Sequence, residues 1–117
     1  MTNKEILEEV TATCYGVIAS SRRKNDTVAK DGIRYEPGVF HPERLDLKRY
    51  WIVLRFLKEH GFLETVLCRE ISRLSDAVND TQRFKKLLAL IVATLYAVDT
   101  PEAIGIAERL FSHVDVQ

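Results

Sequence analysis

Residues 87–98 form the most apolar run of the chain, LLALIVATLYAV, with Thr94 as its only polar member apart from a tyrosine hydroxyl. A helix that is apolar nearly all round must be covered on most of its sides. A membrane span needs about 20 such residues, whereas this run falls well short of that length and directly follows Lys85 and Lys86. It therefore predicts a buried core helix rather than a membrane segment.

Four other stretches repeat apolar residues at the three- and four-residue spacing of an amphipathic helix. We expect these helices at residues 3–20, from Pro42 or Asp46 to Gly61, at about 63–78, and from Thr100 onward, while the buried helix begins at Asn79 or Asp80. Thr2 with Glu5, and Thr100 with Pro101, are typical helix starts. Gly61 is a typical helix end because it tolerates left-handed backbone.

These elements predict an all-α fold, a compact bundle of about five helices in a single domain over residues 1–117. Apolar residues make up 46% and charged residues 29% of the chain, which is a globular balance. Beyond its main stripe, which includes Leu47, the second helix carries Trp51, Ile52 and Phe56 on other faces. We therefore expect it to lie centrally, and the surplus apolar surface predicts a homo-oligomer or a protein partner.

Residues 22–41 fit no helical repeat and predict one long ordered loop between the first and second helices. Turn signals at Asp31-Gly32 and Pro37-Gly38 flank a short extended piece. Apolar anchors should hold this piece against the bundle while Arg34 points outward. The preceding cations have two interpretations, a solvated helix end or a loop that contacts anions. The candidate interaction residues are Arg22, Arg23, Lys24, Lys30, Arg34, Tyr35, Lys48 and Arg49.

Charge is balanced overall but unevenly distributed. The chain has 17 Lys and Arg against 17 Asp and Glu, yet residues 22–60 hold ten cations against six acids. Phosphates respond to local charge, so a neutral total does not exclude contact with a nucleic-acid backbone. A helix-turn-helix reader is disfavoured, because the helix after Gly61 begins with apolar residues and carries Glu64 and Glu70 on surfaces that would face phosphates.

No signature of catalysis, metal binding or cofactor binding occurs in the sequence. The three histidines are scattered, and His60 is best interpreted as a cation at a helix end. Cys14 and Cys68 lie beside or within apolar stripes, which predicts small buried residues of a reducing compartment. The start of the chain lacks the pattern of a signal peptide. We therefore expect a cytoplasmic protein that is not an enzyme and has no cofactor or small-molecule substrate.

Two functional hypotheses follow. The first is a non-enzymatic regulator, adaptor or small structural subunit that acts through protein–protein contacts. The second is a helical subunit of a ribonucleoprotein complex that binds RNA or DNA backbone independently of sequence, using the basic loop together with Lys48 and Arg49 of the second helix.

Overall fold

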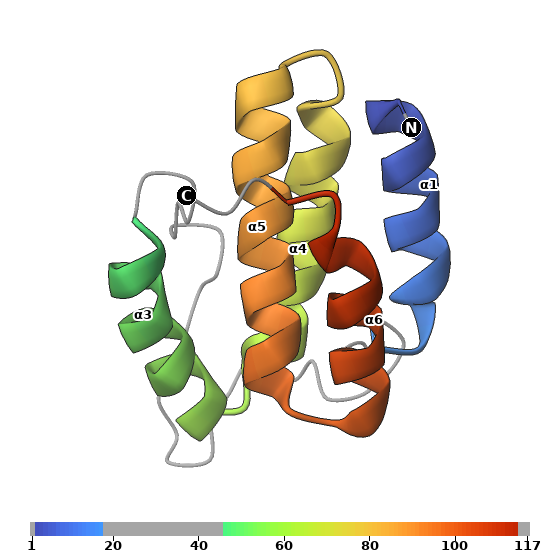
Figure 1. Cartoon of the computed structure of the whole chain (residues 1–117). Helices are drawn as coiled ribbons and strands as arrows, with labels where there is room; N and C mark the ends of the chain where they lie inside the picture. The colour runs from blue at the N-terminus through green and yellow to red at the C-terminus, as the bar shows by residue number, and fades with distance from the viewer. Residues whose placement is uncertain (1, 18–45, 115–117) are drawn as a thin grey trace.

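The computed structural model describes residues 2–17 and 46–114. Within these ranges the chain forms a helical bundle without strands, which confirms the all-α class (Figure 1). The predicted ordered loop of residues 22–41 lies outside the described residues and stays a prediction. The helices of the described part are α1 (Asn3–Thr13), α3 (Leu47–Glu59), α4 (Leu63–Asp76), α5 (Thr81–Val98) and α6 (Pro101–Phe111).

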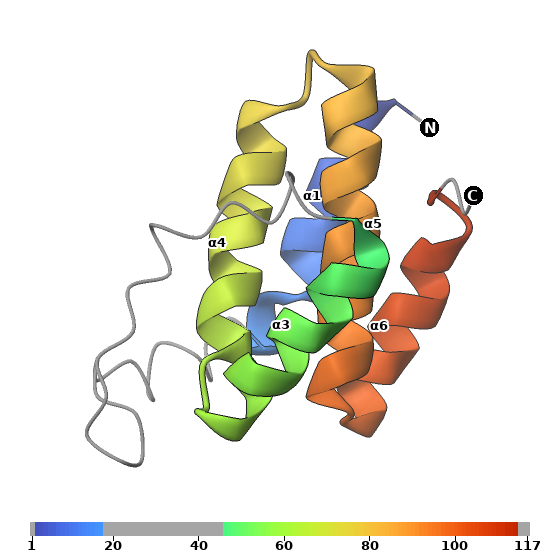
Figure 2. The same ribbon diagram turned by 90° about the vertical axis from the view of Figure 1, so that its left-hand side faces the viewer.

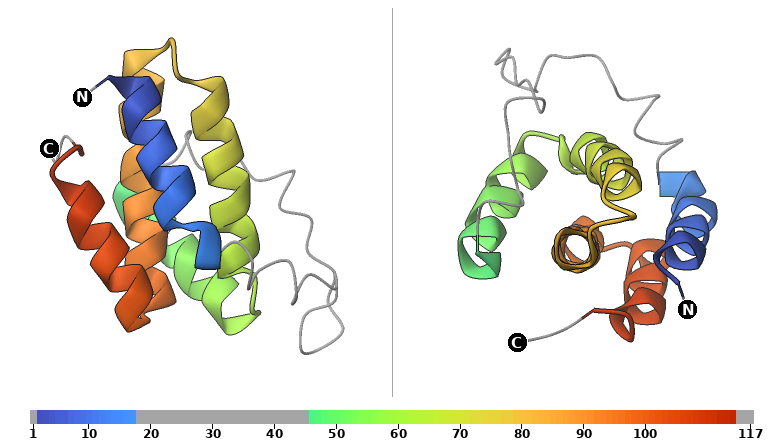
Figure 3. Two further views of the ribbon diagram at one scale, coloured as in Figure 1. Left: turned by 90° about the vertical axis from the view of Figure 1, so that its right-hand side faces the viewer. Right: turned by 90° about the horizontal axis from the view of Figure 1, so that it is seen from above.

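Helix α5 occupies the middle of the bundle, as its composition predicts. Seen from above in Figure 3 (right), α3, α4 and α6 surround α5. Helix α1 packs against α4 on the side of the bundle opposite α3. The buried residues of α5 lie on every side of the helix: Phe84, Leu87, Leu88, Leu90, Ile91, Val92, Ala93, Thr94 and Leu95. Among the residues that the structure describes, no helix combines the length and apolarity needed to cross a membrane.

Helix α3 is not central, so that prediction is wrong. It packs on α5 and α4 through one stripe, Tyr50, Leu54 and Leu57, all fully buried. Figure 2 shows its opposite side turned outward, and none of the other helices that the structure describes lies in front of it. The physical reason is that a bundle this small has one central position, which α5 fills. A 13-residue helix on the periphery then buries a single face.

Short polar side chains fix where four helices begin. Thr2, Asp46, Asp80 and Thr100 each accept a hydrogen bond from the backbone N–H three residues ahead. These bonds satisfy donors that the first helical turn otherwise leaves open. The structure therefore selects Asp46 over Pro42 as the start of α3, and Asp80 over Asn79 as the start of α5.

The first helix is interrupted earlier than predicted. Instead of continuing to residue 20, α1 ends at Thr13 with Cys14 as its C-cap, and helical geometry resumes over residues 15–17. The hydroxyl groups of Thr11 and Thr13 bond back to the carbonyls of Leu7 and Glu9, at 2.8 and 2.7 Å. Such back-bonding weakens and bends a helix, which accounts for a break here. The rest of the predicted helix lies outside the described residues.

Gly61 ends α3 as predicted. Its φ is +77°, and its N–H donates to the Lys58 carbonyl while the Phe62 N–H donates to the Leu57 carbonyl, at 3.1 and 2.9 Å. This is the Schellman arrangement, in which glycine supplies the left-handed residue. The connection places buried Phe62 and Leu63 under α3 and turns the chain directly into α4.

Candidate functional site

The exposed surface of α3 holds most of the exposed apolar residues found in the described part of the chain. Four of the six large apolar residues exposed there belong to α3, namely Leu47, Trp51, Ile52 and Phe56. Four exposed cations share this surface: Lys48, Arg49, Arg55 and Lys58. We call these eight residues the α3 outer face. Clustered exposed apolar groups are uncommon on monomers and typically mark interaction sites.

Two of the eight predicted interaction residues belong to this face. Lys48 and Arg49 lie exposed in the first turn of α3. The Arg49 Nε lies 3.8 Å from the Asp46 carboxylate, but both side chains are well exposed, so solvent screens this pair. The other six predicted residues, Arg22, Arg23, Lys24, Lys30, Arg34 and Tyr35, lie outside the residues that the structure describes.

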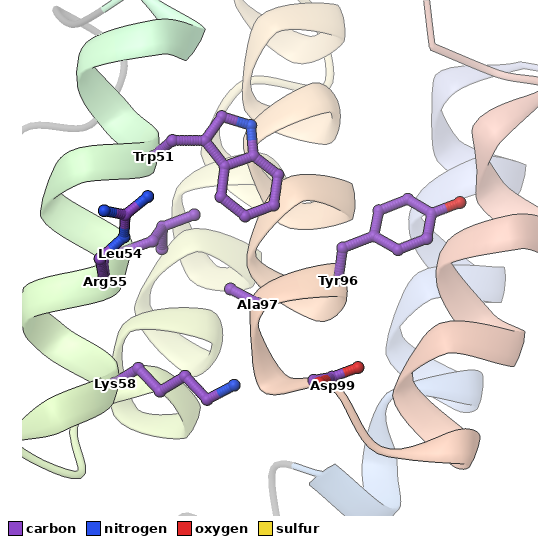
Figure 4. Close-up of a pocket in the computed structure, with 7 residues that line it drawn as sticks. All are labelled: Trp51, Leu54, Arg55, Lys58, Tyr96, Ala97 and Asp99. Carbon is purple, nitrogen blue, oxygen red and sulfur yellow. The ribbon is translucent and has the colours of Figure 1, made fainter.

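A groove runs between α3, from Trp51 to Lys58, and the end of α5 (Figure 4). Its volume is about 370 Å³, within the range of protein binding pockets. Trp51 and Lys58 reach from α3 toward α5, and Leu54 and Ala97 lie between the two helices. The remaining lining residues are Arg55, Tyr96 and Asp99. The groove thus has an apolar centre with cations on the α3 side and a carboxylate at the end of α5.

A buried polar cluster ties α3 to the two helices beneath it. The Tyr50 hydroxyl lies 2.8 Å from Thr94 Oγ1, which in turn lies 3.0 Å from Glu70 Oε2 and 2.7 Å from the Leu90 carbonyl. Thr94 has one hydroxyl hydrogen to donate. The simplest assignment therefore has Tyr50 donating to Thr94, and Thr94 donating to the carbonyl or the carboxyl oxygen. The cluster joins α3, α4 and α5 at one point.

Glu70 corrects a sequence prediction. Its side chain was expected on a surface facing phosphates, but only 1% of the residue is exposed. The start of α4 is also covered, since Leu63 and Val66 are buried. A recognition helix presents its first turns to the DNA groove. With these residues in the core, the α3–α4 pair does not have the form of a helix-turn-helix reader.

His60 is the C-cap residue of α3, at the helix end where the sequence places it. Its Nδ1 lies 2.9 Å from the Phe56 carbonyl oxygen. The two rings are in contact, with centroids 4.1 Å apart and planes tilted by 33°. The half-exposed Phe56 ring on the α3 outer face is therefore in contact with His60.

The two cysteines differ in their surroundings. Cys14 is fully buried, and this burial raises the pKa of its thiol from 9.0 to about 11, although a hydrogen bond with Thr13 acts in the opposite direction. A thiol with a raised pKa is a poor nucleophile at neutral pH. Cys68, predicted to be buried, is instead partly exposed on α4. Across residues 2–17 and 46–114, no three His, Cys, Asp or Glu side chains gather as potential metal ligands.

Comparison of the chain with protein-family models, with curated proteins and with solved structures finds no match.

The sequence prediction missed the residues that define the groove and most of the outer face. Trp51, Ile52 and Phe56 were recognised as surplus apolar surface of a helix expected to be central, but they were not named as interaction residues, and Arg55 and Lys58 were not assigned to a site. One signal was present in the sequence. On a helical wheel, Ile52 and Phe56 lie well away from the stripe of Tyr50 and Leu54, interleaved with cations, as on a contact surface rather than a core.

Proposed function

We propose that this chain is a non-enzymatic, cytoplasmic protein that binds another macromolecule through protein–protein contacts, as a regulator, an adaptor or a small subunit of a larger assembly. The observation that carries the proposal is the concentration of exposed apolar residues on α3. Ile52 is 68% exposed and Phe56 is 50% exposed, although both lie on a helix whose other side is fully packed. Covering such residues supplies the apolar centre of a typical protein interface.

The test is retention of a partner from native cells, followed by binding measurements with the purified partner. The double substitution Ile52→Ser and Phe56→Ser should abolish retention, because it removes apolar anchors without disturbing the core. The matched control is Phe111→Ser on α6, since Phe111 is 47% exposed but lies outside the outer face. Retention that survives the α3 substitutions, or that is lost equally in the control, would contradict the proposal.

Self-association is one form that this function can take. Light scattering across a range of concentrations measures it directly. If the α3 outer face binds a second copy, the mass should fall to that of a monomer in the Ile52→Ser and Phe56→Ser variant. A monomer at every concentration would assign the surface to a different protein.

A second candidate function is sequence-independent binding to an RNA or DNA backbone. It is favoured by the four exposed cations of α3, which lie next to the exposed rings of Trp51 and Phe56. Cations bind phosphates and aromatic rings stack on bases. Mixed-sequence RNA should then bind with an affinity that falls steeply with salt. Substituting Lys48 and Arg49 by Ala should reduce that slope, as should Arg22→Ala with Arg23→Ala. Undetectable binding at low salt would remove this candidate.

A further inference from the structure

We infer that the groove between α3 and α5 binds an acidic amphipathic helix of a partner protein. One apolar side chain of that helix would lie against Trp51 and Leu54, and its carboxylates would lie beside Arg55 and Lys58. This inference rests on the proposed function and names the chemistry of the partner. Docking of an amphipathic helix in an apolar groove is a recurring mode of recognition, in which a few anchors set the fit.

The shape and lining of the groove fit a side-chain anchor. Its volume of about 370 Å³ is at the lower end of the pocket range, enough for one large apolar side chain and its neighbours. Leu54 is fully buried and forms the floor, whereas Trp51 is 45% exposed. A half-exposed indole beside a buried floor gains burial when a partner covers it, which is typical of interface hot spots.

The positive charge of α3 favours a partner with an acidic surface. Residues 47–59 contain four cations and one acid, Glu59, which gives α3 a net charge of +3. No ion pair within the described residues involves Arg55 or Lys58, so both cations are available to a partner. Two copies meeting through their α3 outer faces would place like charges together, which is unfavourable. An acidic helix has the complementary sign.

The Asp99 carboxylate makes the α5 side of the groove differ in charge from the α3 side, which disfavours a nucleic-acid backbone as the ligand. It lies at the end of α5, across the groove from Lys58. A polyanion laid along the groove would bring phosphates toward this carboxylate, whereas a helix can place its acids on the α3 side alone. The carboxylates of the partner should therefore lie near Arg55 and Lys58, with a neutral or basic residue near Asp99.

The single tryptophan of the chain makes the groove directly observable. The probes are three synthetic helical peptides of about four turns with the same Leu and Phe face, flanked by Glu, Gln or Lys. The Glu peptide should shift Trp51 emission in a saturable, salt-sensitive manner. The Gln peptide should bind at least about tenfold more weakly, and the Lys peptide more weakly still, since each carboxylate pair contributes a modest but additive attraction.

Charge reversal gives the decisive variant. Arg55→Glu with Lys58→Glu should lower the affinity for the Glu peptide by about tenfold or more and raise that for the Lys peptide. Arg69→Glu with Lys86→Glu changes the net charge equally but at exposed sites that do not line the groove. This control should leave both affinities within about threefold, because only screened long-range charge is altered. Equal effects of the two double variants would overturn the inference.

Other occupants give distinct outcomes, each of which overturns the proposal. Mixed-sequence RNA that changes Trp51 emission at lower concentration than the Glu peptide would assign the groove to nucleic acid. Emission that depends on protein concentration without peptide would assign it to a second copy. A third outcome is that replacing residues 32–41 by Gly and Ser changes Trp51 emission, while neither the original chain nor the replaced one responds to peptide. That result would make this segment of the chain itself the occupant of the groove.

Failure of this inference differs from failure of the proposed function. If Trp51 ignores all three peptides while Ile52→Ser and Phe56→Ser still abolish partner retention, the groove inference falls and the function stands. If the Glu peptide binds as expected but the substitutions do not affect partner retention, the proposed function is wrong, while the inference that the groove binds an acidic helix still holds.

Discussion

The buried cluster of Tyr50, Thr94 and Glu70 allows a prediction about stability. Thr94→Val replaces the hydroxyl by a methyl group of nearly equal size, so the packing of α5 changes little. The change takes one buried partner away from the Tyr50 hydroxyl and one from the Glu70 carboxyl. Losing a buried hydrogen bond costs about 0.5 to 1.5 kcal/mol, so Thr94→Val, which loses two such contacts, should cost about 1 to 3 kcal/mol.

Tyr50→Phe should cost less, because it removes only the contact between Tyr50 and Thr94 and leaves the Thr94 hydroxyl within hydrogen-bond distance of Glu70 on α4 and of the Leu90 carbonyl on α5. We expect a loss of about 1 kcal/mol. In the double variant the Tyr50 hydroxyl is already absent when Thr94 changes. The two losses should therefore be less than additive by about 1 kcal/mol, as expected for groups in direct contact.

The assay is urea unfolding followed by far-ultraviolet circular dichroism, with the slope of each transition compared between variants. Thr11→Val is the matched control, because the Thr11 hydroxyl makes the same bond to the carbonyl four residues back, at 2.8 Å, but on the surface. It should change stability by less than about 0.5 kcal/mol. If Thr94→Val costs no more than Thr11→Val, or if the two losses add, the cluster does not stabilise the α3 contact as argued.

Two further predictions concern a buried thiol and two glycines. Because the pKa of Cys14 is raised to about 11 in the folded chain, its stabilising contribution is complete below about pH 9 and is lost as pH rises toward 11. The loss should reach roughly 2 to 3 kcal/mol, and the decline measured by urea unfolding at successive pH values should be shallower in Cys14→Ala. A decline of equal steepness in both chains would show that other groups cause it. Gly105→Ala should stabilise by about 0.5 to 1 kcal/mol, because Gly105 is exposed within α6 and an added Cβ meets no atom within 4 Å. Gly61→Ala should instead destabilise by about 1 kcal/mol, because its φ of +77° disfavours a side chain even though there is space for one. Thermal unfolding of both variants measures the difference in sign, and a shift in the same direction for both would contradict the reasoning.

The helix starts and the central helix could be predicted from the sequence because they depend on local chemistry. A hydroxyl or carboxylate such as Thr100 or Asp46 caps a helix through a bond to a residue three positions away. The apolar run of α5 likewise carries its own requirement for burial. Neither inference needs knowledge of which helices are neighbours.

The location of α3 and the groove could not be predicted in the same way, because both depend on distant contacts. An apolar residue such as Ile52 can be covered by its own bundle or by a partner, and the helical pattern is the same in both cases. The groove combines Trp51 and Lys58 with Asp99, which comes from a helix two elements later. Glu70 looked like a surface residue because its buried partner, Thr94, lies 24 positions away.

The hydroxyl contact between Tyr50 and Thr94 also has a consequence for axial register. The apolar stripe of α3 is short, and apolar contacts such as those of Leu54 and Leu57 are not directional, so they discriminate only weakly against a shift of one helical turn, about 5.4 Å. A single buried polar pair can select one register among such near-equal packings. Because Trp51 follows Tyr50 directly, fixing that register also fixes where the indole meets the end of α5. The shape of a surface groove would thus be determined by a hydrogen bond that no partner ever touches.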